Sequence, residues 1–305
     1  MAENFFVAVL TLTIIIMPPT LLPALGEVFS QRSGVLNLGL EGIMLMGAFV
    51  SVAATYTVGN GYIGLLSAMA IGFLFGIITI ITVIALKIDQ VVNGVAIWIF
   101  GLGLSTLLFQ RFTFGIPFPT VSIFGPINIP YVSQIPFLGP IIFQQNFLVY
   151  LSLLAVPLFW LILFRTTAGL KVRAVGENPR AADTSGINVN RVRIVSILLS
   201  TTLAGLGGAY LTLAYVGLFT HNMVAGRGFI ALAIVIFGKW NPARALLGAL
   251  VFGGVEALQI NVQALGIGIP YQFLSMLPYV ITIIVLIAIG RKADFPAALG
   301  VPYKR

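Results

Sequence analysis

Cysteine is absent from the 305 residues of the chain. This absence excludes disulfide bonds, thiolate metal centres and a cysteine nucleophile. Histidine occurs once, at His221, so a metal site built from several histidines and a histidine proton relay are also excluded. Charge is scarce too, since only 8% of the residues are charged, whereas a soluble domain carries about a quarter. Water is therefore not the main solvent of this chain.

Long hydrophobic runs take the place of the missing charge, and 59% of the residues are hydrophobic. A helix needs about 20 apolar residues to cross a bilayer. Nine runs approach or exceed this length, at residues 5–25, 35–56, 62–86, 94–110, 147–164, 194–216, 218–238, 245–261 and 273–290. His221, Asn222 and Arg227 interrupt the run 218–238, which indicates a broken or re-entrant segment. We expect an all-α, polytopic transmembrane bundle of about nine spans (eight to ten), forming a single domain over residues 1–305.

Lys and Arg collect in two segments, as they do in cytoplasmic loops. Residues 165–193 contain the bases Arg165, Lys171, Arg173, Arg180, Arg191 and Arg193 against two acids, Glu177 and Asp183. The C-terminal residues 291–305 add four bases against Asp294. We expect both segments to be cytoplasmic and, with nine spans, the N-terminus to lie outside. The bases form no continuous basic face despite the net charge of +8, so nucleic acid is not an expected partner.

Proline marks residues 111–146, which contain six prolines between Pro117 and Pro140 and one charge, Arg111. Repeated proline removes backbone donors and clashes with the preceding helical turn. We therefore expect an extracellular loop here. Elsewhere, small residues at four-residue spacing predict close helix packing; these pairs are Gly72 and Gly76, Ala204 and Gly208, and Ala249 and Gly253.

Capping residues bracket a short helix within the cytoplasmic segment 165–193. Asn178 can cap the N-terminus of a helix that begins at Pro179, where a missing N–H costs nothing. Gly186 can end the helix in a left-handed conformation. The pattern predicts a helix over about 179–185 that presents Ala181 and Ala182 as a small, smooth surface, suited to a groove of another protein. An incidental helical turn in a basic loop is the alternative interpretation.

Three stretches, in order along the chain, resemble one transporter family. Residues 174–187 read Ala-Val-Gly-Glu-Asn-Pro-Arg-Ala-Ala-Asp-Thr-Ser-Gly-Ile and look like the ATPase-coupling loop of ABC permeases for ribose, branched-chain amino acids and nucleosides. Residues 32–48 and 226–242 resemble the N-terminal and C-terminal signatures of that family. The form Ser-Gly-Val-Leu-Asn-Leu-Gly-Leu-Glu-Gly at 33–42 is most similar to the nucleoside (guanosine-type) branch.

The resemblance implies a set of contacts with an ABC ATP-binding subunit, made by Gly176, Glu177, Asn178, Ala181, Ala182, Gly186 and Ile187. It also implies a second, different permease subunit and an extracellular substrate-binding lipoprotein, in a bacterial cytoplasmic membrane whose lipid surrounds the chain. ATP and Mg would be held by the partner ATPase. The chain has no phosphate-binding loop of its own, because Gly238 and Lys239 are followed by Trp240 and lack the earlier glycine. We expect no cofactor and no metal on this chain.

Four polar residues lie in or beside apolar segments: Asn37, Glu41, Asn93 and Glu256. An ionisable side chain in the membrane costs several kcal/mol unless it faces protein or water. We expect these four to face the interior, where glycines around residues 37–41 permit a broken helix that lines a substrate pathway. Alternatively, the two glutamates hold helices together through an arginine or backbone partner. Residues 33–49 and 226–254 are candidates for an internal repeat.

Several functions remain open at this stage. An enzyme is not expected, because the eight acids offer no close carboxylate pair. An ion-coupled secondary transporter could use Glu41 and Glu256 to bind its ion, yet it has no need for a capped cytoplasmic helix. A channel would show polar rings that are absent. We expect an importer permease for nucleosides that works by alternating access, with ribose or another simple sugar as the alternative substrate.

Overall fold

The computed structural model describes residues 2–115, 118–127, 130, 132–133, 135–265, 270–290 and 295–303. The regular elements within these ranges are helical. The α-helices are α1 (Ala2–Ile16), α2 (Pro18–Arg32), α3 (Leu40–Val58), α4 (Gly61–Ile80), α5 (Gln90–Phe112), α6 (Phe147–Arg165), α7 (Thr167–Glu177), α8 (Pro179–Thr184), α9 (Val189–Tyr210), α10 (Arg227–Phe237), α11 (Pro242–Ala264) and α12 (Tyr271–Gly290). The π-helical turns are η1 (Ile81–Ala85), η2 (Gly139–Phe143) and η3 (Leu211–Val216). The all-α expectation is confirmed for the described residues.

Six helical segments of the described chain are long and apolar enough to cross a membrane: α3, α4 with η1, α5, α6, α9 with η3, and α11. Helices α1 and α2 make a seventh candidate that bends by 43°. The bend lies at Met17, because Pro18 and Pro19 begin a new helix there. The expected count of nine is not confirmed, since α10 is only 11 residues long.

The segment 218–238 is broken, as its interrupting polar residues predict. Residues 217–226 leave the helical conformation, and Asn222, Ala225 and Gly226 have positive φ angles of 53°, 50° and 83°. Helix α10 then begins at Arg227. A helix of this length rises about 16 Å, roughly half of a bilayer core.

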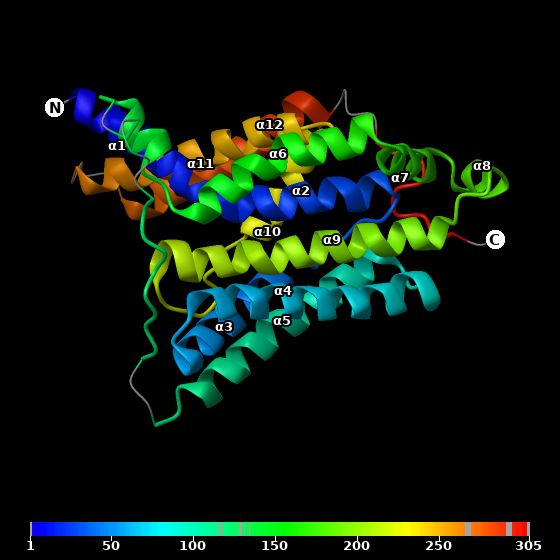
Figure 1. The fold of residues 1–305 in the computed structure, drawn as a ribbon, viewed down its shortest axis with the longest axis horizontal. Coiled ribbons are helices and arrows are strands. Elements are labelled where there is room, and N and C mark those ends of the chain that lie inside the picture. Colours follow the sequence, from blue (N-terminus) through cyan, green and yellow to red (C-terminus); the bar gives the residue numbers. More distant parts are fainter. Residues whose placement is uncertain are drawn as a thin grey trace.

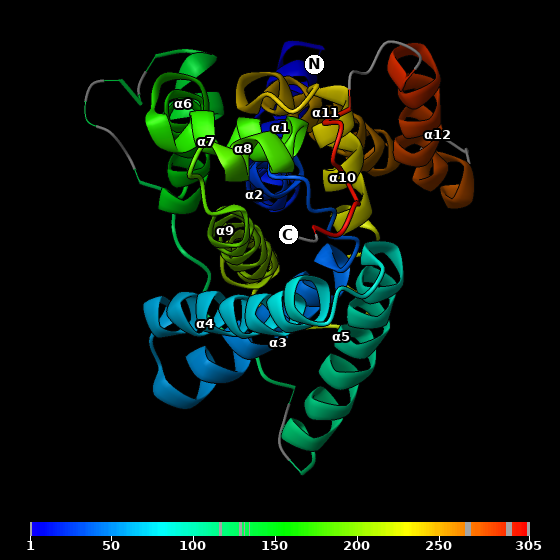
Figure 2. The ribbon, with the colours of Figure 1, turned by 90° about the vertical axis from the view of Figure 1, so that its right-hand side faces the viewer.

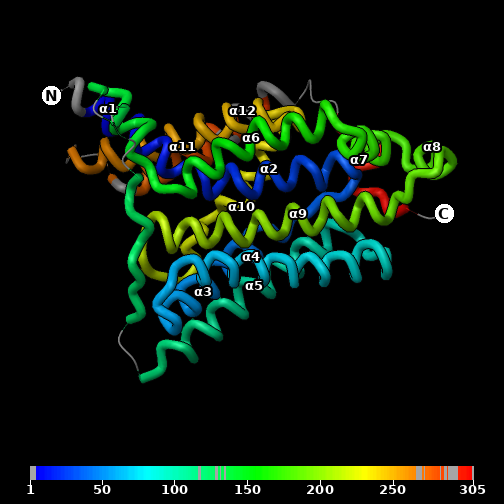
Figure 3. The backbone as a smooth tube through the Cα atoms, viewed as in Figure 1, coloured from blue at the N-terminus to red at the C-terminus, as the bar shows by residue number. Residues whose placement is uncertain are grey.

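Helices α2, α6 and α9 run roughly along one long axis, whereas α5 inclines away from the bundle (Figure 1). Helices α7 and α8 and the C-terminal segment 295–303 lie at one end of this axis, and α1 lies at the other (Figure 3). Viewed along the axis, α9 lies between a layer with α2 and a layer with α3 and α4 (Figure 2). We call the end with α7 and α8 the elbow end.

Helix α9 packs closely because glycine replaces side chains where helices cross. A Cβ on Gly72 would overlap the Thr201 carbonyl, and a Cβ on Gly208 would overlap the Met44 carbonyl. Gly253 similarly approaches the Thr13 carbonyl of α1, where a Cβ would lie 3.1 Å from the oxygen. The predicted packing role of these small residues agrees with their positions.

Two connections differ in part from expectation. The first predicted run ends at residue 25, but the helix does not end there, because α2 continues to Arg32. Residues 111 and 112 belong to the last turn of α5. The described part of 113–146 contains no helix long enough to span, and it packs on the end of η3: the Val121 amide donates to the Gly217 carbonyl at 2.8 Å.

Candidate functional site

Helix α8 has both caps that its sequence predicts. The Asn178 Oδ1 accepts the Ala181 amide at 3.0 Å. At the other end, the Gly186 amide donates to the Asp183 carbonyl and the Ile187 amide donates to the Ala182 carbonyl. Gly186 has φ of +81°, so the helix ends in a Schellman motif. Local capping therefore determines α8, which protrudes beyond the bundle at the elbow end (Figure 1).

The seven predicted coupling residues divide by exposure. Glu177, Asn178, Ala181 and Gly186 are exposed, Ile187 is half-buried, and Gly176 and Ala182 are buried. Ala182 packs in an apolar cluster with Val175 of α7 and Val189 of α9. The buried pair thus positions α8 on the body of the chain, whereas the exposed residues are available to a partner.

Gly176 joins α7 to the end of α2 and to the C-terminal segment. A Cβ at Gly176 would overlap the Arg32 carbonyl oxygen, so only glycine permits this approach. The Gly176 carbonyl accepts the Ala298 amide at 2.9 Å. The Gly34 carbonyl similarly accepts the Gly300 amide at 3.2 Å.

Two arginines also connect the segments that meet near Gly176. Arg193 donates from Nε to the Ser33 carbonyl at 3.2 Å and from Nη1 to the Val301 carbonyl at 3.1 Å. Arg32 donates to the Trp240 carbonyl at 3.3 Å and pairs with Glu177 at 3.8 Å. The end of α7 and the two arginines therefore link α2, α9, the turn before α11 and the C-terminal segment; we call this junction the base of the elbow.

Three of the four predicted interior residues lie in or beside α3 and α5, which pack together, and Glu256 lies on α11, which packs against α10. Asn37, Glu41 and Asn93 are buried, and Glu256 is half-buried. The Glu41 carboxylate accepts the Gly226 and Gly228 amides at 2.7 Å each, and so caps α10. This position suits an anion, because helix N-termini carry unpaired N–H groups and a positive dipole end.

Glu256 of α11 pairs with Arg227 at the start of α10. The Arg227 guanidinium also donates to the Met223 and Val224 carbonyls at 3.2 and 3.1 Å. Both glutamates thus have structural partners, as the alternative interpretation of the sequence has it. The contacts of Glu41 connect 33–49 with 226–254, and the relation of these two segments as a repeat stays a prediction.

Among the described residues, Asn37 and Gln90 each have a buried side-chain amide group without a partner. Its Oδ1 accepts the Gly39 amide at 3.0 Å, while its Nδ2 has no partner. The Gln90 Oε1 accepts the Leu36 amide at 2.7 Å, and the Gln90 Nε2 has no partner. Buried donors are ordinarily satisfied, so these two groups are available to a water molecule or a polar solute.

A buried carboxylate at Glu27 was not anticipated. Its Oε1 accepts the Asn37 amide at 2.9 Å and the Gln31 side chain at 3.2 Å, and its Oε2 accepts the Ser200 hydroxyl at 2.7 Å. Trp240 donates in turn to Gln31 at 2.7 Å. Only the continuation of α2 past residue 25 could have indicated Glu27, since a carboxylate inside a helix between apolar residues must face protein.

Within the described part of the chain, no group of three or more His, Asp or Glu side chains is arranged to hold a metal ion. The polar interior consists of carboxylates and amides that contact backbone N–H groups. The elbow end, with α7 and α8, consists of small residues and residues that cap helices. Helix α2 contacts both regions, because Arg32 pairs with Glu177 of α7 and Glu27 accepts the Asn37 amide.

Residues 7–288 match the family described as the branched-chain amino acid transport system permease component. The chain belongs to this family. It is a transport subunit of the membrane and not an enzyme. Membership implies an ATP-binding partner and a second permease subunit, and places this multi-pass protein in the plasma membrane.

Three relatives align with nearly the whole chain. The guanosine ABC transporter permease protein NupQ of Bacillus subtilis is 42% identical over 95% of this chain and 94% of its own length. The nucleoside ABC transporter permease protein NupC of Lactococcus lactis is 41% identical over 93% of each. A Haloferax volcanii protein, provisionally named as the glucose ABC transporter permease TsgC13, is 36% identical over 93% of this chain and 92% of its own.

A solved structure shares the fold. It is an ABC transporter, assigned to the metal-chelate type, in an inward-facing conformation. It aligns with a TM-score of 0.52 and 15% identity, over 92% of this chain and 85% of the other. The likeness shows that the helices follow an ABC permease arrangement.

Proposed function

We propose that this chain is the permease subunit of a bacterial ABC importer that moves nucleosides across the cytoplasmic membrane. Two of the relatives reported above carry guanosine or nucleoside in their names. The chain acts as one permease domain over residues 1–305. A second permease subunit completes the pathway, ATP and Mg are held by the ATPase, and an extracellular lipoprotein delivers the nucleoside.

The elbow end faces the cytoplasm in this proposal, and the N-terminus faces outside. Six bases lie between Arg165 and Arg193, and Lys87 lines a pocket with Asp183 of α8 at the same end. Lys239 lies beside the end of α2, because Arg32 donates to the Lys239 and Trp240 carbonyls, and Arg244 follows in the first turn of α11. Such an excess of bases is typical of cytoplasmic loops.

Helix α8 carries the proposal of ATP coupling. It is capped at both ends, protrudes, and exposes Ala181 together with Glu177, Asn178 and Gly186. We take these residues and Ile187 as the surface that docks into the ATPase, with Gly176 and Ala182 supporting it from below. Closure of the ATPase dimer moves α8, and the contacts of Gly176 and Arg32 transmit that movement to α2.

The interior polar residues serve the pathway in this proposal. Asn37 and Asn93 lie near the start of α3 and α5, and Glu41 and Glu256 hold α10 in place. The unpartnered amides of Asn37 and Gln90 support a polar solute near this centre. A nucleoside offers both acceptors and donors for such groups.

Uptake of labelled guanosine, adenosine, uridine and ribose tests the proposal in cells that carry the complete transporter. Ala181→Glu places a charge on the docking surface and is expected to abolish nucleoside uptake while the protein remains in the membrane. The matched control is Ala243→Glu, in the exposed first turn of α11, where a carboxylate is favourable.

Each outcome has a defined meaning. Nucleoside uptake that is lost only in Ala181→Glu supports an ATP-coupled nucleoside permease. Undiminished uptake in that variant contradicts the coupling surface and favours an ion-coupled secondary transporter. If the cells take up ribose but no nucleoside, the ATP-coupled mechanism stands and the transported substrate is a sugar.

A further inference from the structure

A groove of about 670 Å³ opens between α6, α7 and α9 at the elbow end, with Phe29 of α2 at its base. Its size falls within the range of small-molecule sites, about 300–1,000 Å³. The groove lies apart from the interior polar residues described above, and it extends to Gly186 and Ile187 beside α8. It therefore connects the membrane-embedded helices with the base of the docking helix.

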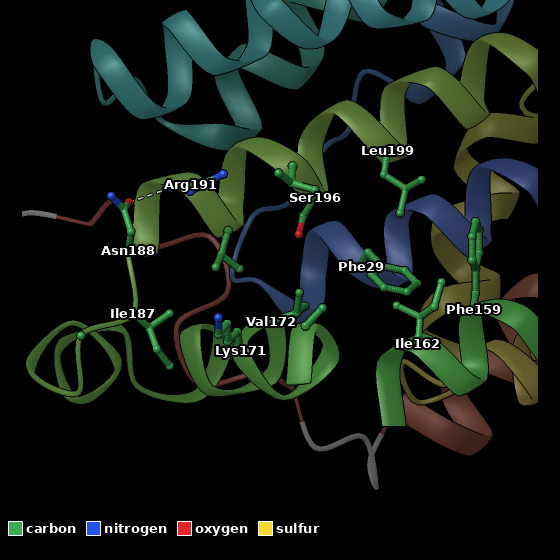
Figure 4. Close-up of a pocket in the computed structure, with 14 residues that line it drawn as sticks. Phe29, Phe159, Ile162, Lys171, Val172, Ile187, Asn188, Arg191, Ser196 and Leu199 are labelled. Carbon is green, nitrogen blue, oxygen red and sulfur yellow. Dashed lines mark hydrogen bonds between the residues drawn. The ribbon is translucent and has the colours of Figure 1, made fainter. Parts of the chain in front are cut away.

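The chemistry of the groove changes along its length. Phe29, Phe159 and Ile162 gather at one end, and Lys171 and Arg191 lie toward the other (Figure 4). Such a gradient matches an amphiphile, whose apolar part buries hydrocarbon surface and whose polar part stays at the interface.

The charged side chains of the groove are basic. Among the described residues that line it, the charged ones are Lys171 and Arg191, and both are exposed. In the described ranges the salt bridges join other residues, Arg32 with Glu177 and Arg227 with Glu256. The groove is therefore complementary to an anionic head group.

Its sides are apolar and exposed. Val195 of α9 lines the groove with 60% of its surface exposed, and Leu161 of α6, beside the lining residue Ile162, is 51% exposed. Helices α6 and α9 lie on the side of the bundle away from α5 and α12 (Figure 2). Exposed aliphatic side chains on helices long enough to span a bilayer face its hydrocarbon, so the groove opens toward lipid.

We propose that this groove binds an anionic phospholipid of the cytoplasmic leaflet, with an acyl chain against Phe29, Phe159 and Ile162 and the phosphate between Lys171 and Arg191. Basic pockets between transmembrane helices on the cytoplasmic side are suited to such head groups. This lipid site rests on the proposed cytoplasmic position of the elbow end and does not depend on which substrate is transported. The lipid contacts both α7 and α9 beside α8, and so stabilises the packing of α7 and α8 against α9.

The test measures phosphatidylglycerol retained by the intact transporter, purified with its partner subunits and analysed by native mass spectrometry against phosphatidylcholine. The variant Lys171→Gln with Arg191→Gln is expected to retain phosphatidylglycerol at least about tenfold more weakly, because two bases at the membrane surface are lost. Its matched control is Lys87→Gln with Arg244→Gln, an exposed lysine and arginine at the same end.

A second variant tests the apolar part. Ala168→Trp fills the groove without removing a charge, and is expected to displace the lipid as well. Equal retention by the double variant and its control would overturn the proposal, as would displacement by glycerol phosphate alone, which would indicate a simple phosphate site. A photoreactive residue at Val195 that captures the second permease subunit would make the groove an interface and overturn it too. Lipid retention is measured without transport, so its failure is separable from that of the proposed function.

Discussion

Individual polar residues show where sequence reasoning succeeds and where it stops. Asn37, Glu41 and Asn93 could be placed in the interior because burying them toward lipid is costly. The partners of Glu41 could not be foreseen, because the Gly226 and Gly228 amides lie more than 180 residues away. Glu27 escaped notice because the first apolar run ends at residue 25 and because its partner Ser200 is distant in sequence.

Glu41→Gln tests the capping of α10. Glutamine presents one acceptor in place of a carboxylate that receives two N–H groups, so one amide loses its partner. We expect the free energy of unfolding to fall by about 1–3 kcal/mol, as for a buried donor left unsatisfied. Thermal unfolding of the purified transporter measures it.

The control for this prediction is Glu177→Gln. Glu177 is exposed and forms a 3.8 Å ion pair with Arg32, so its removal is expected to cost less than about 1 kcal/mol. If both variants unfold alike, the carboxylate of Glu41 does not hold α10.

Whole elements were predictable to the extent that local signals define them. Helix α8 could be predicted from Asn178, Pro179 and Gly186 because its caps are made by neighbouring residues. The number of spans could not, since the prolines and polar residues that mark a bend at Met17 and a break before α10 do not tell whether each bent or shortened segment crosses the membrane. Hydropathy alone cannot separate a full span from half of one.

Asn178→Ala tests the role of α8 as an element. The substitution removes the N-cap acceptor of the Ala181 amide and is expected to cost about 1 kcal/mol of helix stability. Hydrogen exchange of the amides in 181–185 should accelerate about fivefold, and nucleoside uptake should fall with it.

Asn60→Ala provides the comparison. Asn60 caps α4 by the same type of bond, 2.9 Å to the Tyr62 amide, between α3 and α4. This variant is expected to leave exchange in α8 and uptake unchanged. Equal loss of uptake in both would show that capping of α8 has no special part in coupling.

At the scale of the molecule, charge predicts which segments share an end, but not how they are joined. The charge pattern predicts that residues 165–193 and the C-terminal residues lie on the same side of the membrane. The contacts of Ala298, Gly300 and Val301 with Gly176, Gly34 and Arg193 appear only in the structure. These bonds use backbone groups, which have no signature in sequence.

Arg193→Lys tests this junction. A guanidinium reaches the Ser33 and Val301 carbonyls together, whereas an ammonium is a single point donor. We expect the free energy of unfolding to fall by about 1.5–3 kcal/mol for a lost hydrogen bond to a charged group. Arg191→Lys, two residues earlier and exposed, should leave the unfolding temperature of the transporter unchanged; an equal decrease would contradict a specific role for Arg193.

The C-terminal segment also sets the order in which the protein can be completed. A chain is synthesised from its N-terminus, so α2, α7 and α9 emerge from the ribosome before residues 298–301. The carbonyls of Gly34 and Gly176 therefore stay without these donors until Ala298 and Gly300 have been synthesised. A nascent chain that stops short of residue 298 lacks the two hydrogen bonds that join the ends of α2 and α7 to the C-terminal segment.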